Sequence, residues 1–398
     1  MTAKLYPDEI PNWINGQERK SANNELFDKL RPADGSLMCR VVRSRAEAVD
    51  QAVVAAKQAQ PVWADVPAVK RGEVLHEIVL AMKAHQAEIA RIVAEETGKS
   101  YKEAYGETGG AIALGLFYAS EGQRLYGRTT TSGTPNKYAM TVRQPVGVAG
   151  LIIAANTPIA NVAWKVFPAL ICGNAAVLKA AEDTPVTAWI FGKLAHAAGL
   201  PAGVLNVVQG YGEEAGQPLV AHPDVDVISF TGSTEVGRLV QRIAGERLAK
   251  ISLELGGKNP LVVCDDADLD NAVKWVVLSA FSNAGQRCAA GSRIIVFESI
   301  YEQFREMLVA RTQMLKVGPT DDDDFGPVIN ETQLKNMLTA IERARQSGAL
   351  ILTGGEQLSD PAYGQGFYLS PTIIERVDRR HEISEQELFG PIVPGQRF

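Results

Sequence analysis

Cysteine and histidine are scarce in this sequence, and neither is spaced for metal binding. The four cysteines, Cys39, Cys172, Cys264 and Cys288, are far apart and form no Cys-x-x-Cys pair, and the five histidines form no His-x-x-x-His pair. Because zinc sites need closely spaced ligands, we expect no metal site. Separated cysteines also favour reduced thiols over a disulfide framework, as in a cytoplasmic protein.

Long apolar runs and basic clusters are also missing. The longest apolar run, residues 146–155, is too short to span a bilayer, and the N-terminal MTAKLYPDEIPNW lacks the apolar stretch of a signal peptide. Net charge is −6, with 40 Lys and Arg against 46 Asp and Glu and no basic block. We therefore expect a cytoplasmic location and neither a membrane nor a nucleic acid as partner.

Continuous apolar runs alternate with helical patterns from residue 146 onward, in a chain of 398 residues that is 46% hydrophobic. Such runs predict a parallel sheet covered by helices on both faces, hence an α/β fold. The expected strands are 148–154, 175–178, 204–208 and 227–230, with helices near 161–172, 186–198, 213–221 and 234–245. A second α/β block follows Gly256-Gly257, with strands at 261–263, 294–297, 350–352 and 368–374 and helices near 268–283, 300–315 and 331–347.

The chain before residue 146 has weaker signals. Short strands are expected over residues 11–43, and Asn15-Gly16 predicts a hairpin because both residues tolerate positive φ. Two or three helices are expected between about residues 46 and 124, one of them ending at Gly98. Residues 138–142 are an isolated strand candidate.

Small residues surround Cys288 in the segment FSNAGQRCAAGSR, residues 281–293. The backbone can therefore approach a group that meets the sulfur, on a connection between a helix and a strand where reactive groups are common. The alternative is a small buried cysteine with no chemistry, which residue type alone favours.

Two segments of the first block suit a dinucleotide. Residues 230–237, FTGSTEVG, follow a strand and open a helix, so that Gly232 allows a sharp turn and Ser233 offers its N–H to a pyrophosphate. Lys179 and Glu182 follow another strand of the same sheet, where they could bind ribose hydroxyls. An N-cap without a ligand and a surface ion pair are the alternatives.

Three further residues could take part in a reaction. Asn156, before Pro158 at a strand end, could donate its amide to an oxyanion, although Asn is also common in turns. Glu254 lies in an apolar strand, where a carboxylate could be a general base or a buried structural group. Glu387, in ELFGP, adds a carboxylate beside a Gly-Pro turn.

The chain resembles the NAD(P)-dependent aldehyde dehydrogenase superfamily over essentially all of its length. The resemblance rests on LELGGK (253–258), GQRC (285–288), FTGS (230–233) and ELFGP (387–391). It implies that Cys288 is the nucleophile, Glu254 the general base, and Asn156 with the Cys288 N–H the oxyanion hole. It also implies a cofactor site, for NAD or alternatively NADP, made by Lys179, Glu182, Gly232, Ser233, Val236, Glu387 and Phe389.

The implied reaction oxidises an aldehyde to a carboxylic acid through a Cys288 thiohemiacetal and thioester. A CoA-acylating enzyme is an alternative, but Glu254 argues against it because a hydrolytic base would destroy the thioester. A second alternative is a shortened relative of low activity that binds a dinucleotide or a protein partner. Glu182 favours NAD, since a carboxylate repels a 2′-phosphate, although Lys179 could accommodate one.

Small residues stand where the family often has bulky ones. Ala155, Thr157, Ser282 and Gly110 predict a roomy pocket with few aromatic side chains, for a bulky or polar aldehyde. Arg287 and Arg124 could attract an anionic substrate, or could form structural salt bridges.

The resemblance also implies a Rossmann-like dinucleotide-binding domain and a second α/β catalytic domain. The expected divisions are 1–127 and 144–256 for the NAD-binding domain, 128–143 for an oligomerisation strand region and 257–398 for the catalytic domain. The family continues past its Glu-x-Phe-Gly-Pro segment, adding a strand to a partner subunit's sheet. This sequence, ending at Phe398, is therefore expected to be a fragment or a shortened form, and a homodimer or homotetramer if that segment exists.

Overall fold

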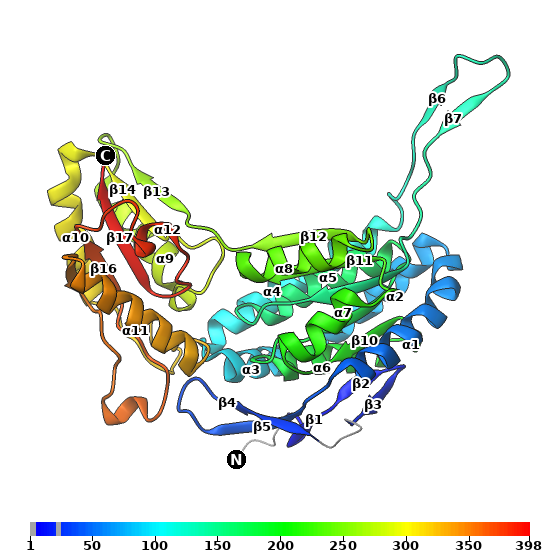
Figure 1. The fold of residues 1–398 in the computed structure, drawn as a ribbon, viewed down its shortest axis with the longest axis horizontal. Coiled ribbons are helices and arrows are strands. Elements are labelled where there is room, and N and C mark those ends of the chain that lie inside the picture. The colour runs from blue at the N-terminus through cyan, green and yellow to red at the C-terminus, as the bar shows by residue number, and fades with distance from the viewer. Residues whose placement is uncertain (1–4, 21–24) are drawn as a thin grey trace. The chain divides into compact units, whose positions relative to one another are not determined.

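A computed structural model describes residues 5–20 and 25–398, which divide into two compact units (Figure 1). The first unit takes Met1–Lys29, Cys39–Ile92 and Tyr105–Glu254, and the second takes Leu30–Met38, Val93–Ala104 and Leu255–Phe398. The segments 30–38 and 93–104 thus belong to the second unit, although the sequence-based division assigned them to the first block.

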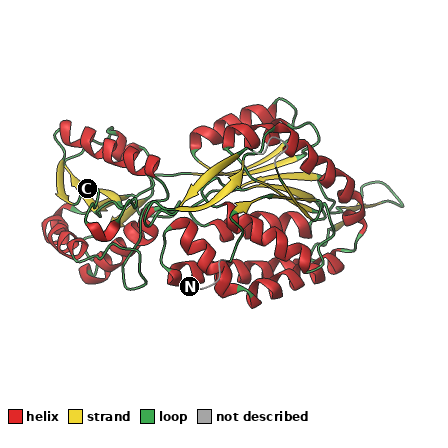
Figure 2. Ribbon diagram, turned by 90° about the horizontal axis from the view of Figure 1, so that it is seen from below, coloured by secondary structure: helices red, strands yellow, loops and turns green. Residues whose placement is uncertain are grey.

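The first unit is built on a sheet whose strand order is β12-β11-β8-β9-β10-β2-β3 in the described residues. Its central strands, β11, β8, β9 and β10, run parallel, and all residues of β8 and β9 are buried. Helices cover both faces of this sheet (Figure 2), as the apolar runs predicted. The strands are β2 (Asn12–Ile14), β3 (Gln17–Arg19), β8 (Val148–Ile152), β9 (Ala175–Lys179), β10 (Leu205–Val208), β11 (Val227–Gly232) and β12 (Lys250–Leu255).

Four helices, rather than the expected two or three, form between residues 46 and 121. Val66-Pro67 separates the first two because Pro67 excludes helical backbone at the preceding residue, and Gly98, at φ +77°, ends the third as predicted. They are α1 (Ala46–Asp65), α2 (Ala68–Ala84), α3 (Gln86–Thr97) and α4 (Tyr101–Glu121). Later helices are α5 (Pro158–Ile171), α6 (Pro185–Ala197), the π-helix η1 (Gly212–Gly216), α7 (Gln217–Ala221) and α8 (Thr234–Gly245).

The hairpin predicted at Asn15-Gly16 is confirmed. The two residues have φ of 53° and 72°, and they join β2 to its antiparallel neighbour β3. A small sheet of order β1-β5-β4 lies nearby in sequence, made by β1 (Glu9–Ile10), β4 (Leu26–Leu30) and β5 (Leu37–Val42). The strand candidate at 138–142 is β7 (Tyr138–Met140), which pairs with β6 (Thr129–Thr131) in a hairpin that projects from the first unit (Figure 1).

The second unit holds a sheet of order β13-β14-β17-β16-β15 in the described residues. Its central strand, β17 (Ile392–Arg397), was not predicted, because Pro394-Gly395 reads as a turn rather than as an inner strand. The expected strand 368–374 begins only at Thr372. The other elements are β13 (Pro260–Val263), β14 (Arg293–Val296), β15 (Leu350–Thr353), β16 (Thr372–Glu375), α9 (Leu269–Phe281), α10 (Tyr301–Gln313), α11 (Glu331–Gln346), α12 (Glu382–Glu385) and the 3₁₀ turns η2 (Ser282–Gly285), η3 (Glu298–Ile300) and η4 (Pro361–Tyr363).

Helices and sheet of the second unit enclose one apolar cluster. Phe281 of α9 stacks on Phe325 at a ring separation of 6.4 Å, and Phe304 of α10 and Ile341 of α11 are buried in the same cluster. The prediction of an α/β fold is confirmed. No helix in the described part of the chain combines the length and apolar character needed to cross a bilayer.

Candidate functional site

The carboxyl ends of three neighbouring strands bring candidate residues to one edge of the first sheet. Ile152 of β8 pairs with Phe230 of β11 on one side and with Lys179 of β9 on the other. Since the strands are parallel, the residues that follow them, Asn156 and Ser233, lie at the same edge as Lys179. This is where open α/β sheets bind ligands.

Asn156 lies between β8 and α5, and the start of α5 is stabilised by a distant carboxylate. Thr157, the N-cap residue, makes no side-chain cap. Instead Glu107 Oε1, from α4, accepts hydrogen bonds from the N–H groups of Ile159 at 3.1 Å and Ala160 at 3.3 Å. Glu107 was not predicted from the sequence, because a capping group some 50 residues from its helix leaves no local pattern.

Lys179 and Glu182 form an ion pair at the end of β9. Lys179 is buried, and its Nζ atom lies 2.8 Å from Glu182 Oε2, whose side chain is 42% exposed. Burial alone would raise the pKa of Glu182, but the Lys179 ammonium outweighs it and the pKa is lowered. A fixed, ionised carboxylate therefore stands at the edge.

Gly232 and Ser233 join β11 to α8. A Cβ atom at Gly232 would lie 2.5 Å from Phe230 Cζ, so glycine is needed there because the backbone packs closely on the Phe230 ring. The φ of Gly232 lies outside the left-handed region, so backbone conformation is not the reason for the glycine. Ser233 is the N-cap of α8, and its hydroxyl accepts the N–H of Val236 at 3.3 Å. The Ser233 hydroxyl thus caps α8, and the N-terminus of α8 places the positive end of the helix dipole at this edge of the sheet.

Lys165 is a further candidate that the sequence analysis missed. It is buried in α5, donates from Nζ to Ser229 Oγ of β11 at 2.8 Å, and has its pKa lowered to about 8 by burial, partly offset by Glu254. Its only sequence signal is a lysine in a mostly apolar helix. Glu254 itself, expected in an apolar strand, is exposed, because β12 lies at the sheet edge with alternate residues facing solvent.

Cys288 lies in the second unit, on the predicted connection between α9 and β14. It is exposed at the second position of a tight turn that the Ala290 N–H closes on Arg287 O at 3.0 Å. Within residues 5–20 and 25–398, nothing accepts a hydrogen bond from the Cys288 N–H, whereas the Cys288 carbonyl accepts one from Asn259 Nδ2 at 2.6 Å. Thiol and N–H are both available to an incoming group.

The backbone before Cys288 is unusual. Asn283, Ala284 and Gly285 have φ of 53°, 53° and 68°, a left-handed turn that costs about 1–2 kcal/mol for a residue with a Cβ such as Ala284. Glu103 Oε1 accepts the Asn283 N–H at 3.0 Å, and all three residues of the turn are buried. Such strain persists only where surrounding contacts over-determine it, as they often do near functional groups.

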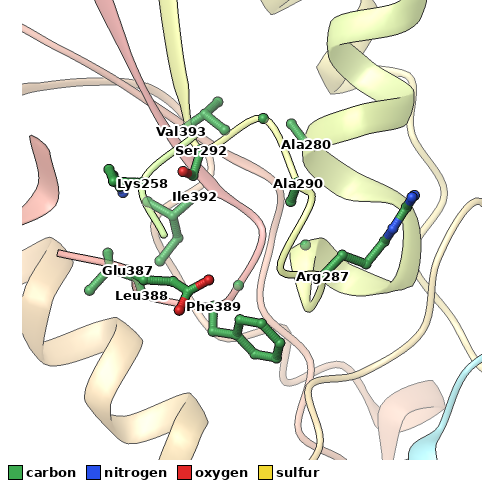
Figure 3. A pocket seen from close by; sticks show the side chains of 13 residues that line it. Lys258, Ala280, Arg287, Ala290, Ser292, Glu387, Leu388, Phe389, Ile392 and Val393 are labelled. Carbon is green, nitrogen blue, oxygen red and sulfur yellow. The ribbon is translucent and has the colours of Figure 1, made fainter. Parts of the chain in front are cut away.

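Glu387 and Phe389 line a small pocket of about 10 Å³ in the second unit, room for one water (Figure 3). Burial raises the pKa of Glu387, although the Gly257 N–H, which donates to it, and Lys258 oppose this. A Cβ at Gly256 would lie 1.8 Å from Glu387 Oε2, so the Gly-Gly pair lets the carboxylate approach the backbone. Arg287 also borders the pocket, but its side chain points away from Glu387 (Figure 3).

Lys258 belongs to the same pocket as Glu387. Its pKa is lowered to about 8, first by burial and then by Arg293, against the opposing effect of Glu387.

The candidate residues fall into two groups by unit. The first unit holds Asn156, Lys165, Lys179, Glu182, Gly232, Ser233, Val236 and Glu254, and the second holds Cys288, Glu387 and Phe389. In the described chain, no three His, Cys, Asp or Glu side chains are placed to hold a metal ion.

Comparison with known proteins identifies the family. The family model described as "Aldehyde dehydrogenase family" matches residues 18–398. The chain belongs to the aldehyde dehydrogenase family. It is 40% identical over 385 residues to the α-ketoglutaric semialdehyde dehydrogenase of Bacillus subtilis, covering 96% of this chain and 79% of that one. The predictions of the family, of an oxidoreductase and of aldehyde oxidation to the acid are confirmed.

Two further similar aldehyde dehydrogenases are described with different cofactors, one with NADP(+) and the other with NAD+. The D-glyceraldehyde dehydrogenase (NADP(+)) of Thermoplasma acidophilum is 36% identical over 401 residues, covering 100% of this chain and 80% of its own. The betaine aldehyde dehydrogenase of Staphylococcus aureus, solved in complex with NAD+, has a TM-score of 0.95 at 32% identity, covering 98% of this chain and 78% of its own. The fold is that of an aldehyde dehydrogenase.

Proposed function

We propose that this aldehyde dehydrogenase uses Cys288 as its nucleophile, with Asn156 and the Cys288 N–H as the oxyanion hole and Glu254 as the general base. The observation that carries the proposal is the turn at Cys288. An exposed thiol and an N–H without a partner in the described structure stand on the same residue. A nucleophile and an oxyanion donor are needed at the same carbonyl group, and one residue supplies both.

In this reaction the Cys288 thiolate attacks the aldehyde carbon, and the carbonyl oxygen becomes an oxyanion. The Cys288 N–H and the Asn156 amide donate to that oxygen. A nicotinamide cofactor, when bound, would accept the hydride that the thiohemiacetal on Cys288 loses as it becomes a thioester. Glu254 takes a proton from water, which attacks the thioester and releases the acid and the thiol.

The edge of the first sheet suits a dinucleotide. Glu182, held by Lys179, can accept hydrogen bonds from ribose hydroxyls, and the α8 N-terminus at Ser233 can bind a pyrophosphate, with Gly232 and Val236 beside it. Glu387 and Phe389 would hold the nicotinamide ribose. We propose NAD as the preferred cofactor, because the Glu182 carboxylate repels a 2′-phosphate, while NADP remains the alternative, as in the Thermoplasma relative.

For the substrate we propose a polar or anionic aldehyde in a roomy pocket. The Bacillus relative is named for α-ketoglutaric semialdehyde, a carboxylated aldehyde. Around Gly110 a Cβ would meet no atom within 4 Å, and Arg287, beside the nucleophile, is exposed and its guanidinium donates to Ser282 Oγ at 2.8 Å. Arg124, by contrast, is paired with Glu121 at 2.6 Å, which favours its structural alternative.

The test is cofactor reduction with a panel of aldehydes, with and without an anionic group. Cys288→Ser is expected to lose at least about 10³-fold in kcat, and Glu254→Gln to form the thioester in a burst but release acid slowly. A CoA-acylating enzyme would instead give product only when CoA is added. A binding relative without activity would bind NAD yet reduce none of it, and either result would refute the proposal.

We also propose a cytoplasmic homo-oligomer whose hairpin β6–β7 contributes to the subunit contact. Support comes from four cysteines that are all free thiols and from the exposure of Tyr138 and Met140 on that hairpin, 86% and 64%. Light scattering of the purified protein would give a monomer mass if the oligomer does not exist.

A further inference from the structure

One side-chain amide spans the turn that carries Cys288. Asn259 Nδ2 lies 2.6 Å from the carbonyl oxygen of Cys288 and 3.0 Å from that of Ala290. The same turn is closed by the Ala290 N–H on Arg287 O. Asn259 thus fixes the peptide plane that follows Cys288 and holds Ala290, whose N–H in turn fixes the Arg287 carbonyl and with it the plane that contains the Cys288 N–H, because each peptide group is rigid.

Asn259 is itself fixed. Its backbone oxygen accepts the N–H groups of Ser292 and Arg293, each at 3.1 Å, and the next residue, Pro260, begins β13. β13 pairs in parallel with β14 from Pro260 and Arg293 onward. The amide therefore connects the turn to the start of a hydrogen-bonded strand pair.

A second amide holds the chain that enters the turn. Gln286 is buried; its Oε1 accepts the Ile329 N–H at 2.8 Å, and its Nε2 donates to Asn283 O at 3.2 Å. Together with the left-handed turn at residues 283–285, this fixes the backbone up to Gln286. In the turn that follows, residues 287–290, the Asn259 side chain adds two hydrogen bonds, to the carbonyls of Cys288 and Ala290.

We propose that Asn259 is a positioning residue for Cys288, keeping its thiol and its N–H directed at the same point. The inference rests on the proposed role of Cys288 as nucleophile. Asn259 touches neither substrate nor cofactor in this role; it acts through the turn. If the Cys288 thiol and N–H point in different directions, the thiol cannot attack a carbonyl carbon whose oxygen is bound by that N–H. Loss of Asn259 is therefore expected to slow the chemical step.

The test compares Asn259→Leu, which keeps the shape but has no donor, with Asn259→Ala, which loses both. Both variants are expected to lower kcat by about tenfold to 100-fold, with KM for the cofactor changed by less than about twofold. In the protein without cofactor or aldehyde, both are expected to slow iodoacetamide alkylation of Cys288 at least threefold. Alkylation of the exposed Cys264 in the same chain, read by mass spectrometry, is the internal reference.

Asn330→Ala is the matched control. Asn330 caps α11 through its side chain, which accepts the Gln333 N–H at 2.8 Å, so its loss is expected to lower the melting temperature by removing a helix cap. It is expected to leave kcat and Cys288 alkylation as in the wild type. A space-filling role for Asn259 would make the Leu variant behave like the wild type in both assays, and this would overturn the proposal.

The remaining outcomes are also decisive. If neither Asn259 variant folds, as judged by circular dichroism, while Asn330→Ala does, Asn259 is structural and the proposal is rejected. If Cys288→Ser keeps full activity, the proposed reaction fails, whatever Asn259 does. If Cys288→Ser is inactive but both Asn259 variants are alkylated and turn over as the wild type does, only the present inference fails.

Discussion

Glu107 Oε1 accepts the backbone N–H of Ile159 at 3.1 Å, so a carboxylate of α4 caps the helix that begins two residues after Asn156. The first helical residue, Pro158, has no N–H to offer, and the Ala160 N–H donates to the same oxygen. An anion at a helix N-terminus is stabilising, and here it fixes the start of α5 against α4. The position of Asn156 thus depends on a residue far away in sequence.

We predict that Glu107→Ala lowers kcat about tenfold and the free energy of unfolding by about 1–2 kcal/mol, because α5 loses its cap. The diagnostic measurement is a double-mutant cycle with Asn156→Ala. If Glu107 acts through Asn156, its effect on kcat nearly disappears in the Asn156→Ala background. Fully additive losses would show that Glu107 affects the rate by another route. Glu77→Ala, on the surface of α2, is the control.

Features set by local pattern could be predicted from the sequence. The buried strands β8 and β9 follow from uninterrupted apolar runs, and the β2–β3 hairpin from Asn15-Gly16. The positions of Ser233 at a helix start and Cys288 in a connection were predicted for the same reason. Each is decided by residues within a few positions of one another.

Features set by distant partners could not be predicted. β17 contains Pro394-Gly395, and only its pairing with β14 and β16 makes it a strand. Glu107 and Asn259 look like ordinary polar residues until the fold brings them to α5 and to the turn at Cys288. The exposure of Glu254 likewise depends on β12 lying at the edge of the sheet, and this position cannot be predicted from the residues of that strand alone.

Glu182→Gln is predicted to shift cofactor preference. The lowered pKa of Glu182 means that the carboxylate is ionised at neutral pH, where it can accept ribose hydroxyls and repel a 2′-phosphate. The variant should raise KM for NAD about tenfold and lower KM for NADP, since about 1.4 kcal/mol corresponds to a factor of ten. Initial rates at varied NAD and NADP test this. Glu235→Gln, on the first turn of α8, is the control, and an unchanged ratio of the two KM values would contradict the prediction.

Lys165→Met is predicted to stabilise the protein at neutral pH. With its folded pKa near 8, below the ordinary value of 10.5, the unfolded chain binds the Lys165 proton more tightly. The loss of folding stability caused by the buried Lys165 ammonium is therefore fully present below pH 8 and disappears as the pH rises toward 10.5. The variant should gain up to about 2 kcal/mol at pH 7, after loss of the Ser229 hydrogen bond, and less at pH 10.

Urea unfolding of Lys165→Met and the wild type at a series of pH values measures that difference. Lys250→Met, at an exposed position of β12, is the control for loss of a surface charge. A Lys165→Met protein whose advantage grows with pH would mean that the lysine is better stabilised when charged, contrary to the argument.

Gly232→Ala should damage cofactor binding through a clash rather than through backbone strain. The added methyl would lie 2.5 Å from the Phe230 ring, so the β11–α8 connection must move, and the α8 N-terminus at Ser233 moves with it. We expect KM for NAD to rise about tenfold or more, because a misplaced helix end no longer meets the pyrophosphate. Phe230→Leu in the same protein should recover most of the loss by making room. Gly245→Ala, where a methyl meets no atom within 4 Å, is the matched control and should leave KM unchanged. A double variant as impaired as Gly232→Ala alone would show that the ring is not the obstacle.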